Sequence, residues 1–105
     1  MDERYEIRDG VLIVGLGHEL DDPCATRVRL ETDAWIRKGE IQGILFDFSN
    51  TVFMDSSGIG MMIGRYKKMK AQGGFVGVTG VGRSINRIME ISGLYKIMEI
   101  FEIQK

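Results

Sequence analysis

Residues 44–78 have the sequence ILFDFSNTVFMDSSGIGMMIGRYKKMKAQGGFVGV, which predicts a strand, a helix and a second strand. Residues 44–48 are almost all apolar and do not alternate, a pattern typical of a central strand covered on both faces by helices. A helix is predicted over 56–72, because apolar residues recur on one stripe until Gly73-Gly74: Ile59, Met62, Ile63, Tyr66 and Met69. Residues 75–78 form the next strand. Such a strand-helix-strand unit crosses over right-handed to a parallel neighbour.

The residues before this unit predict a hairpin and a helix. Tyr5 and Ile7 lead into Asp9-Gly10, a dipeptide favoured in type I′ turns, and an apolar run follows over 11–16. Asp22 is predicted as a helix N-cap with Pro23 at the first helical position, and the helix extends to Gly39. This segment therefore adds an antiparallel hairpin and one helix.

After the unit, a shorter helix carries Ile85, Ile88 and Met89 and ends at Gly93, and residues 97–101 can add an edge strand. The predicted fold is a single-domain α/β fold. It has a mixed, mostly parallel sheet, an N-terminal hairpin and about three helices.

The amino-acid composition argues against several classes of function. With 105 residues, of which 44% are hydrophobic, the chain suits one domain over 1–105. One cysteine and one histidine exclude an intrachain disulfide and the usual zinc clusters, so no metal site is expected. Glycine pairs at 15–17 and 80–82 lack the P-loop and dinucleotide patterns, and no cofactor is expected. Without an apolar run long enough for a membrane span or a signal peptide, we expect a cytoplasmic protein with no membrane partner.

Charge is distributed unevenly. Residues 1–60 hold 12 acidic and 6 basic side chains, whereas residues 61–105 hold 3 acidic and 8 basic ones. This dipolar pattern suits steering toward a protein partner. It lacks the basic excess of a nucleic-acid binder, so direct nucleic-acid binding is not expected.

The carboxyl ends of the parallel strands are where ligands and partners collect in such sheets, and here that edge holds residues 53–60. Asp55, Ser56 and Ser57 stand at a helix start. One of them is a natural N-cap, which is the simple structural interpretation. The alternative is phosphorylation of a serine, which would add roughly 1.5 to 2 negative charges beside Asp55.

The helix after these serines has an unusually smooth side, formed by Gly58, Gly60 and Gly64. Either a partner approaches closely there, or the helix packs tightly on its own sheet. Met61 lies off the predicted core stripe and is expected to be an exposed, adaptable apolar contact. Four basic residues of the same helix are expected on its solvated face: Arg65, Lys67, Lys68 and Lys70.

Other reactive side chains have simpler interpretations. A hydrolase using Ser56 or Ser57 with His18 and Asp21 is disfavoured, because the serines lack a G-x-S-x-G elbow. His18 is expected on the surface. Cys24 is expected to be a packing residue, although a helix N-terminus can lower the pKa of a thiol.

Three motifs carry a resemblance to a family. The string Phe53–Gly60, continuing through Gly64-Arg65-Tyr66-Lys67, resembles the signature of bacterial anti-sigma factor antagonists with the STAS fold. The segment 17–21 resembles the G-E-L-D segment of that family, and 91–94 resembles its M-S-G-L string. The likeness is greatest to the sporulation antagonists of spore-forming Firmicutes, although Asp22-Pro23-Cys24 replaces the histidines common there.

The resemblance implies a regulatory protein without enzymatic activity. In that family the unphosphorylated antagonist binds an anti-sigma factor that is a GHKL-type serine kinase and frees a sigma factor. Phosphorylation of the serine after the aspartate, here Ser56, ends that binding, and a metal-dependent serine phosphatase resets the switch. Together with the smooth side of the helix, the resemblance predicts partner contacts at eight positions: Asp21, Asp55, Ser57, Gly58, Ile59, Gly60, Met61 and Gly64. The alternative is a ligand-sensing or scaffold STAS domain without a phospho-switch.

Overall fold

The computed structural model describes residues 3–102 and contains a five-stranded sheet with strand order β1-β2-β4-β6-β7. The predicted hairpin is confirmed: β1 (Arg4–Arg8) pairs antiparallel with β2 (Val11–Gly15). Its turn has positive φ at Asp9 (51°) and Gly10 (79°), as a type I′ turn requires at both central positions.

The rest of the sheet is parallel, so the predicted mixed sheet is confirmed. The central strand β4 (Gly43–Asp47) lies between β2 and β6 (Phe75–Thr79). A short strand β7 (Glu99–Ile100) pairs parallel with β6 at the edge, inside the range predicted for it. Because all these strands run the same way, the loops that follow β2, β4 and β6 meet at one edge of the sheet.

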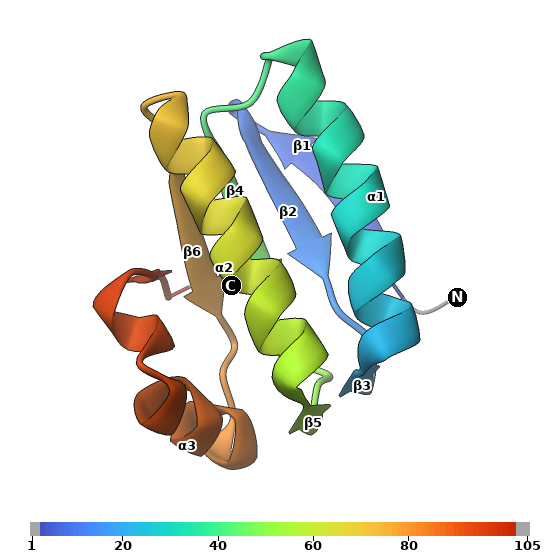
Figure 1. The fold of residues 1–105 in the computed structure, drawn as a ribbon, viewed down its shortest axis with the longest axis vertical. Coiled ribbons are helices and arrows are strands. Elements are labelled where there is room, and N and C mark those ends of the chain that lie inside the picture. Colours follow the sequence, from blue (N-terminus) through green and yellow to red (C-terminus); the bar gives the residue numbers. More distant parts are fainter. Residues whose placement is uncertain (1–2, 103–105) are drawn as a thin grey trace.

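Three helices cover the sheet and its end. Helix α1 (Asp22–Lys38) and helix α2 (Ser56–Ala71) both lie in front of the sheet in Figure 1, and α3 (Arg83–Ser92) lies near its lower end. A 3₁₀ turn, η1 (Leu94–Lys96), follows α3. The fully buried centre of the core combines strand and helix residues: Leu12, Val14, Val28, Ile44, Phe46, Met62, Met69, Val78, Ile85 and Met89.

The prediction that helices cover β4 on both faces is wrong. Helices α1 and α2 share one face. On the other face Leu45 is 9% exposed and lines a pocket together with Ile13 and Phe75. The ring of Phe75 lies over Gly43, where an added Cβ would approach it to 2.3 Å, and the ring of Phe101 covers Gly77 in the same way at 2.4 Å. Two aromatic rings therefore cover part of this face, where the sequence pattern had suggested a helix.

The first helix begins one residue earlier than predicted. Its N-cap is Asp21, whose carboxylate accepts a hydrogen bond from the Cys24 amide at 3.2 Å, and Asp22 is already helical. Two consecutive aspartates made the sequence ambiguous, and the extended backbone of Asp21 (φ −100°, ψ −174°) shows which one caps. Gly39 ends the helix in the left-handed conformation, as expected.

Helix α2 is buried on two sides, which corrects two expectations. Met61 is only 5% exposed and is not a free surface contact, because α2 packs against α1 as well as against the sheet. Arg65, which the sequence places on the solvated basic side, is 2% exposed. Its guanidinium donates to Thr32 Oγ1 at 2.9 Å and forms an ion pair with Asp33 on α1. The α1–α2 contact thus adds a second buried stripe.

Among residues 3–102, no helix combines the length and the apolar character that a membrane crossing needs.

Candidate functional site

Two very short strands set the geometry of the predicted site. Strand β3 (Glu19–Leu20) precedes α1, strand β5 (Phe53–Met54) precedes α2, and the two pair in parallel with Leu20 opposite Met54. The next residues along the two strands are Asp21 and Asp55. Parallel neighbours lie roughly 5 Å apart, so this pairing places the N-termini of α1 and α2 side by side (Figure 1).

Asp55 is the N-cap of α2. Its Oδ1 accepts hydrogen bonds from the amides of Ser57 (2.9 Å) and Gly58 (3.3 Å). The interpretation of one residue here as a helix cap is therefore confirmed for Asp55. Two of the N–H groups at the helix end are satisfied by this carboxylate, so neither serine hydroxyl is needed for capping.

Ser56 is the first residue of α2 and is exposed. Its hydroxyl makes no hydrogen bond to any described residue, whereas the neighbouring Ser57 is half-buried. The exposed hydroxyl of Ser56 lies at the positive end of the α2 dipole and beside the two capping aspartates, Asp21 and Asp55. An anion added at Ser56 would be tolerated by the helix but would add to an acidic edge.

The three glycines of α2 have different surroundings. A Cβ on Gly58 would lie 2.8 Å from Leu20 Cγ and from Met54 Cγ, so close packing on β3 and β5 requires a glycine there. Gly60 and Gly64 have nothing within 4 Å of an added Cβ. The smooth side of the helix is therefore accessible to a partner at Gly60 and Gly64, whereas Gly58 packs against β3 and β5 inside the domain.

A shallow groove runs between α1 and α2 beside the serines, with a volume of about 270 Å³. The groove is lined by residues from both helices: Asp22, Ala25, Thr26, Arg29, Ser57, Gly60 and Met61. Met61 thus forms part of its floor and does not project from the surface. The missing side chain of Gly60 helps to keep the groove open.

Two exposed apolar residues at this edge escaped the sequence analysis. Val52 is 52% exposed and Phe53 is 45% exposed, directly before the buried Met54. The burial of Met54 and exposure of Phe53 follow the two-residue period of a strand. That alternation was a usable signal, but the strand β5 is too short for it to stand out. Together with half-buried Ile59, these residues give the edge an apolar component.

The other candidate chemistries find little support in the geometry. His18 is exposed as expected, and its side chain makes no hydrogen bond to Ser56, Ser57 or Asp21 among the described residues. Burial raises the pKa of the Cys24 thiol to about 11, with Glu3 adding to the effect, so the packing interpretation holds for this cysteine. Within residues 3–102 no group of His, Cys, Asp or Glu side chains is arranged to hold a metal ion.

The family is shown by the model of the STAS domain, which matches residues 4–103. The chain belongs to the STAS domain family.

Among its relatives is a protein of Paenibacillus polymyxa named anti-sigma F factor antagonist, 41% identical over 93 residues, which cover 89% of this chain and 80% of that protein. A protein of the same name from Lysinibacillus sphaericus is 28% identical, over 79% of this chain and 71% of its own length. The structure is also similar to that of the Bacillus cell fate determinant SpoIIAA in its phosphorylated form. The TM-score is 0.80 at 23% identity, covering 98% of this chain and 92% of the other. The observed fold, with three helices and an N-terminal hairpin on a mixed sheet, is the fold of that family.

Proposed function

We propose that this chain is an anti-sigma factor antagonist whose binding is switched by phosphorylation of Ser56. In its unphosphorylated form it binds an anti-sigma factor that is a GHKL-type serine kinase, and a sigma factor is released. Phosphorylation of Ser56 ends that binding, and a metal-dependent serine phosphatase restores it. The domain acts by binding and performs no catalysis.

The main support for the proposal is the hydroxyl of Ser56, which is not used in capping the helix. Asp55 performs the capping that would otherwise account for a serine at this position, and Ser56 Oγ is exposed without a hydrogen-bond partner among the described residues. The relatives support the same function, since two carry the name anti-sigma F factor antagonist and SpoIIAA has been solved in a phosphorylated form.

Release follows from electrostatics. A phosphate on Ser56 carries about 1.5 to 2 negative charges, and the α2 N-terminus stabilises an anion there by only roughly 0.3 to 1 kcal/mol. The fold is therefore preserved. In a complex, however, the phosphate must lose water next to Asp21 and Asp55, whose charge has the same sign. Desolvating an anion against like charge costs several kcal/mol when the interface excludes water.

The docking surface in this proposal lies around Ser56 and uses the accessible members of the predicted set: Asp21, Asp55, Ser57, Ile59, Gly60 and Gly64. Exposed Val52 and Phe53 extend it, and the groove between α1 and α2 admits a partner side chain beside Gly60. Gly58 and Met61 contribute from inside, since both are buried. This mixture of an acidic edge, apolar side chains and a groove suits a protein partner.

Intact-mass measurement after incubation with ATP and the cognate anti-sigma factor kinase tests the proposal. The wild-type chain is expected to gain one phosphate, Ser56→Ala none, and the matched variant Ser57→Ala one. Because neither serine side chain caps the helix, both variants are expected to keep their fold, which circular dichroism checks. Phosphate on Ser56→Ala would move the site to another residue, and no phosphate on the wild type would favour a STAS domain without a phospho-switch.

A further inference from the structure

The glycines on the sheet face opposite α1 and α2 are of two kinds. Gly43 and Gly77 are covered by the rings of Phe75 and Phe101, so the missing side chain makes room for an aromatic ring. Gly15 lies on the same face, since it pairs with Asp47 of β4, two residues from Leu45. No ring covers it. A Cβ on Gly15 would meet only Arg4, at 3.6 Å, and its φ is not positive, so neither packing nor backbone conformation requires a glycine.

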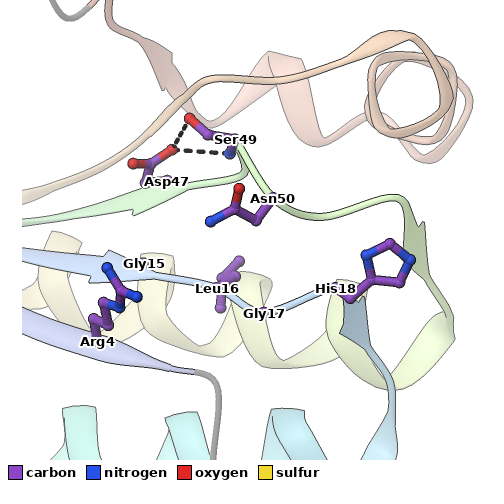
Figure 2. Close-up of a pocket in the computed structure, with 8 residues that line it drawn as sticks. All are labelled: Arg4, Gly15, Leu16, Gly17, His18, Asp47, Ser49 and Asn50. Atoms are coloured by element: carbon purple, nitrogen blue, oxygen red, sulfur yellow. Dashed lines mark hydrogen bonds between the residues drawn. The ribbon is translucent and has the colours of Figure 1, made fainter.

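Gly15 forms the floor of a cavity of about 410 Å³ at the carboxyl ends of β2 and β4. The walls come from β1, from the segment after β2, and from the last residue of β4 with the loop that follows it: Arg4, Leu16, Gly17, His18, Asp47, Ser49 and Asn50. Figure 2 shows these side chains around the strand that carries Gly15. Ligand sites in open α/β sheets gather at this edge, and sites for small molecules are of this size.

Opposite charges stand on the two sides of the floor. Gly15 of β2 pairs with Arg4 of β1 on one side and with Asp47 of β4 on the other. The register therefore places all three residues in one row across the sheet. Adjacent strands are roughly 5 Å apart, which separates the Arg4 and Asp47 backbones by about 10 Å.

No ion pair joins Arg4 to Asp47 within residues 3–102. Oδ1 of Asp47 accepts hydrogen bonds from the amide (2.9 Å) and the hydroxyl of Ser49, while Oδ2 has no partner among the described residues. One carboxylate oxygen and one guanidinium are thus left available on opposite walls of the cavity.

We infer that this cavity binds a small planar molecule with an anionic group at one end and an ammonium group at the other. The flat part lies over Gly15, as Phe75 lies over Gly43 and Phe101 over Gly77. The anionic group pairs with Arg4, and the ammonium group donates to Oδ2 of Asp47, which is the charge-assisted geometry that both groups favour. This site shares no lining residue with the docking surface around Ser56 and does not depend on the function proposed there.

A titration followed by ¹H–¹⁵N correlation spectra tests the inference, with 4-(aminomethyl)benzoate as the probe. Its ring separates a carboxylate from an ammonium group across the molecule. The expected result is saturable shifts of the Gly15, Gly17 and Asn50 amide signals, with a dissociation constant in the millimolar range or below. Benzoate and benzylamine, which each carry one of the two charges, are expected to bind at least about tenfold more weakly.

Gly15→Ala is the decisive variant, because a methyl group raises the floor of the cavity without a steric conflict. It is expected to weaken probe binding at least about tenfold while leaving the thermal unfolding midpoint no lower than that of the wild type. Gly82→Ala, which also adds a methyl group in open space but lies directly before α3, is the matched control and is expected to bind as the wild type does. Asp47→Asn is expected to weaken binding of the zwitterion but not of benzoate.

Three results would overturn the inference. They are the absence of saturable shifts at these amides, equal affinity for benzoate and the zwitterion, and unchanged affinity in Gly15→Ala. In each case the cavity would be a solvent-filled depression that Arg4 and Asp47 border without a ligand.

Discussion

Replacing Gly58 by alanine tests whether this glycine serves internal packing or partner docking. The new Cβ would lie 2.8 Å from Leu20 Cγ and from Met54 Cγ, and 3.0 Å from the Leu20 carbonyl oxygen. Two of these atoms are side-chain atoms of β3 and β5, and the third is backbone, so the short strands must move. Overpacking of this kind costs typically about 1 to 3 kcal/mol.

The gain in helix propensity offsets part of this cost. Alanine is favoured over glycine inside a helix by about 1 kcal/mol, which leaves Gly58→Ala destabilised by roughly 0 to 2 kcal/mol. Gly60→Ala is the matched control, since nothing lies within 4 Å of its Cβ, and it is expected to gain about 0.5 to 1 kcal/mol. The two variants should therefore differ in unfolding free energy by about 1 to 3 kcal/mol.

Urea unfolding, followed by the fluorescence of the single tryptophan, Trp35, measures this difference directly. We predict a lower urea midpoint for Gly58→Ala than for Gly60→Ala, with similar slopes. If the two variants were equally stable, the close packing of Gly58 on β3 and β5 would be refuted. Gly58 would then be better explained by contact with a partner.

Three further predictions concern single side chains elsewhere. Asp55→Ala should lose about 0.5 to 2 kcal/mol of stability in urea unfolding because two capped amides lose their acceptor, whereas Asp55→Asn should lose less; equal losses would contradict capping by hydrogen bonds. Hydrogen bonds from Arg27 hold the pKa of Glu3 below its ordinary value of 4.5. The contribution of this pair to the free energy of unfolding is therefore complete above that pH and is lost as the pH falls through the lowered pKa. Arg27→Met should move the acid-unfolding midpoint to higher pH, and an unchanged midpoint would count against the pair. Cys24, with its pKa raised to about 11, should react with iodoacetamide far more slowly in the folded chain than in urea, and equal rates would disprove its burial.

The order and type of the main elements could be predicted because local signals agreed with the tertiary structure. Asp9-Gly10 determined the hairpin turn, and the apolar run of β4 indicated the sheet centre. The position of Ser56 at the start of α2 followed from the same reasoning, since helix starts have a recognisable composition.

The errors arose where contacts between distant segments decide burial. Met61 and Arg65 are buried by α1, and no periodicity within α2 shows that a second helix lies beside it. The run in β4 suggested helices on both faces, but Leu45, which lines a pocket with Phe75 and other side chains of the sheet, gives the same apolar pattern. The placement of Asp21 beside Asp55 depends on the pairing of β3 with β5, two strands of two residues each that no sequence window could reveal.

Calorimetry of the Ser56→Asp variant against the cognate anti-sigma factor kinase tests whether a negative charge at Ser56 ends partner binding. The substitution adds a carboxylate at the α2 N-terminus, where the helix dipole preserves the fold, next to the charges of Asp21 and Asp55. A carboxylate carries less charge than a phosphate, so we predict binding weakened at least about tenfold but not abolished. Ser92→Asp, which adds the same charge to an exposed serine at the far end of α3, should bind as the wild type does. If Ser56→Asp keeps its fold and binds as tightly as the wild type, the partner does not dock at this edge and the proposed switch is wrong.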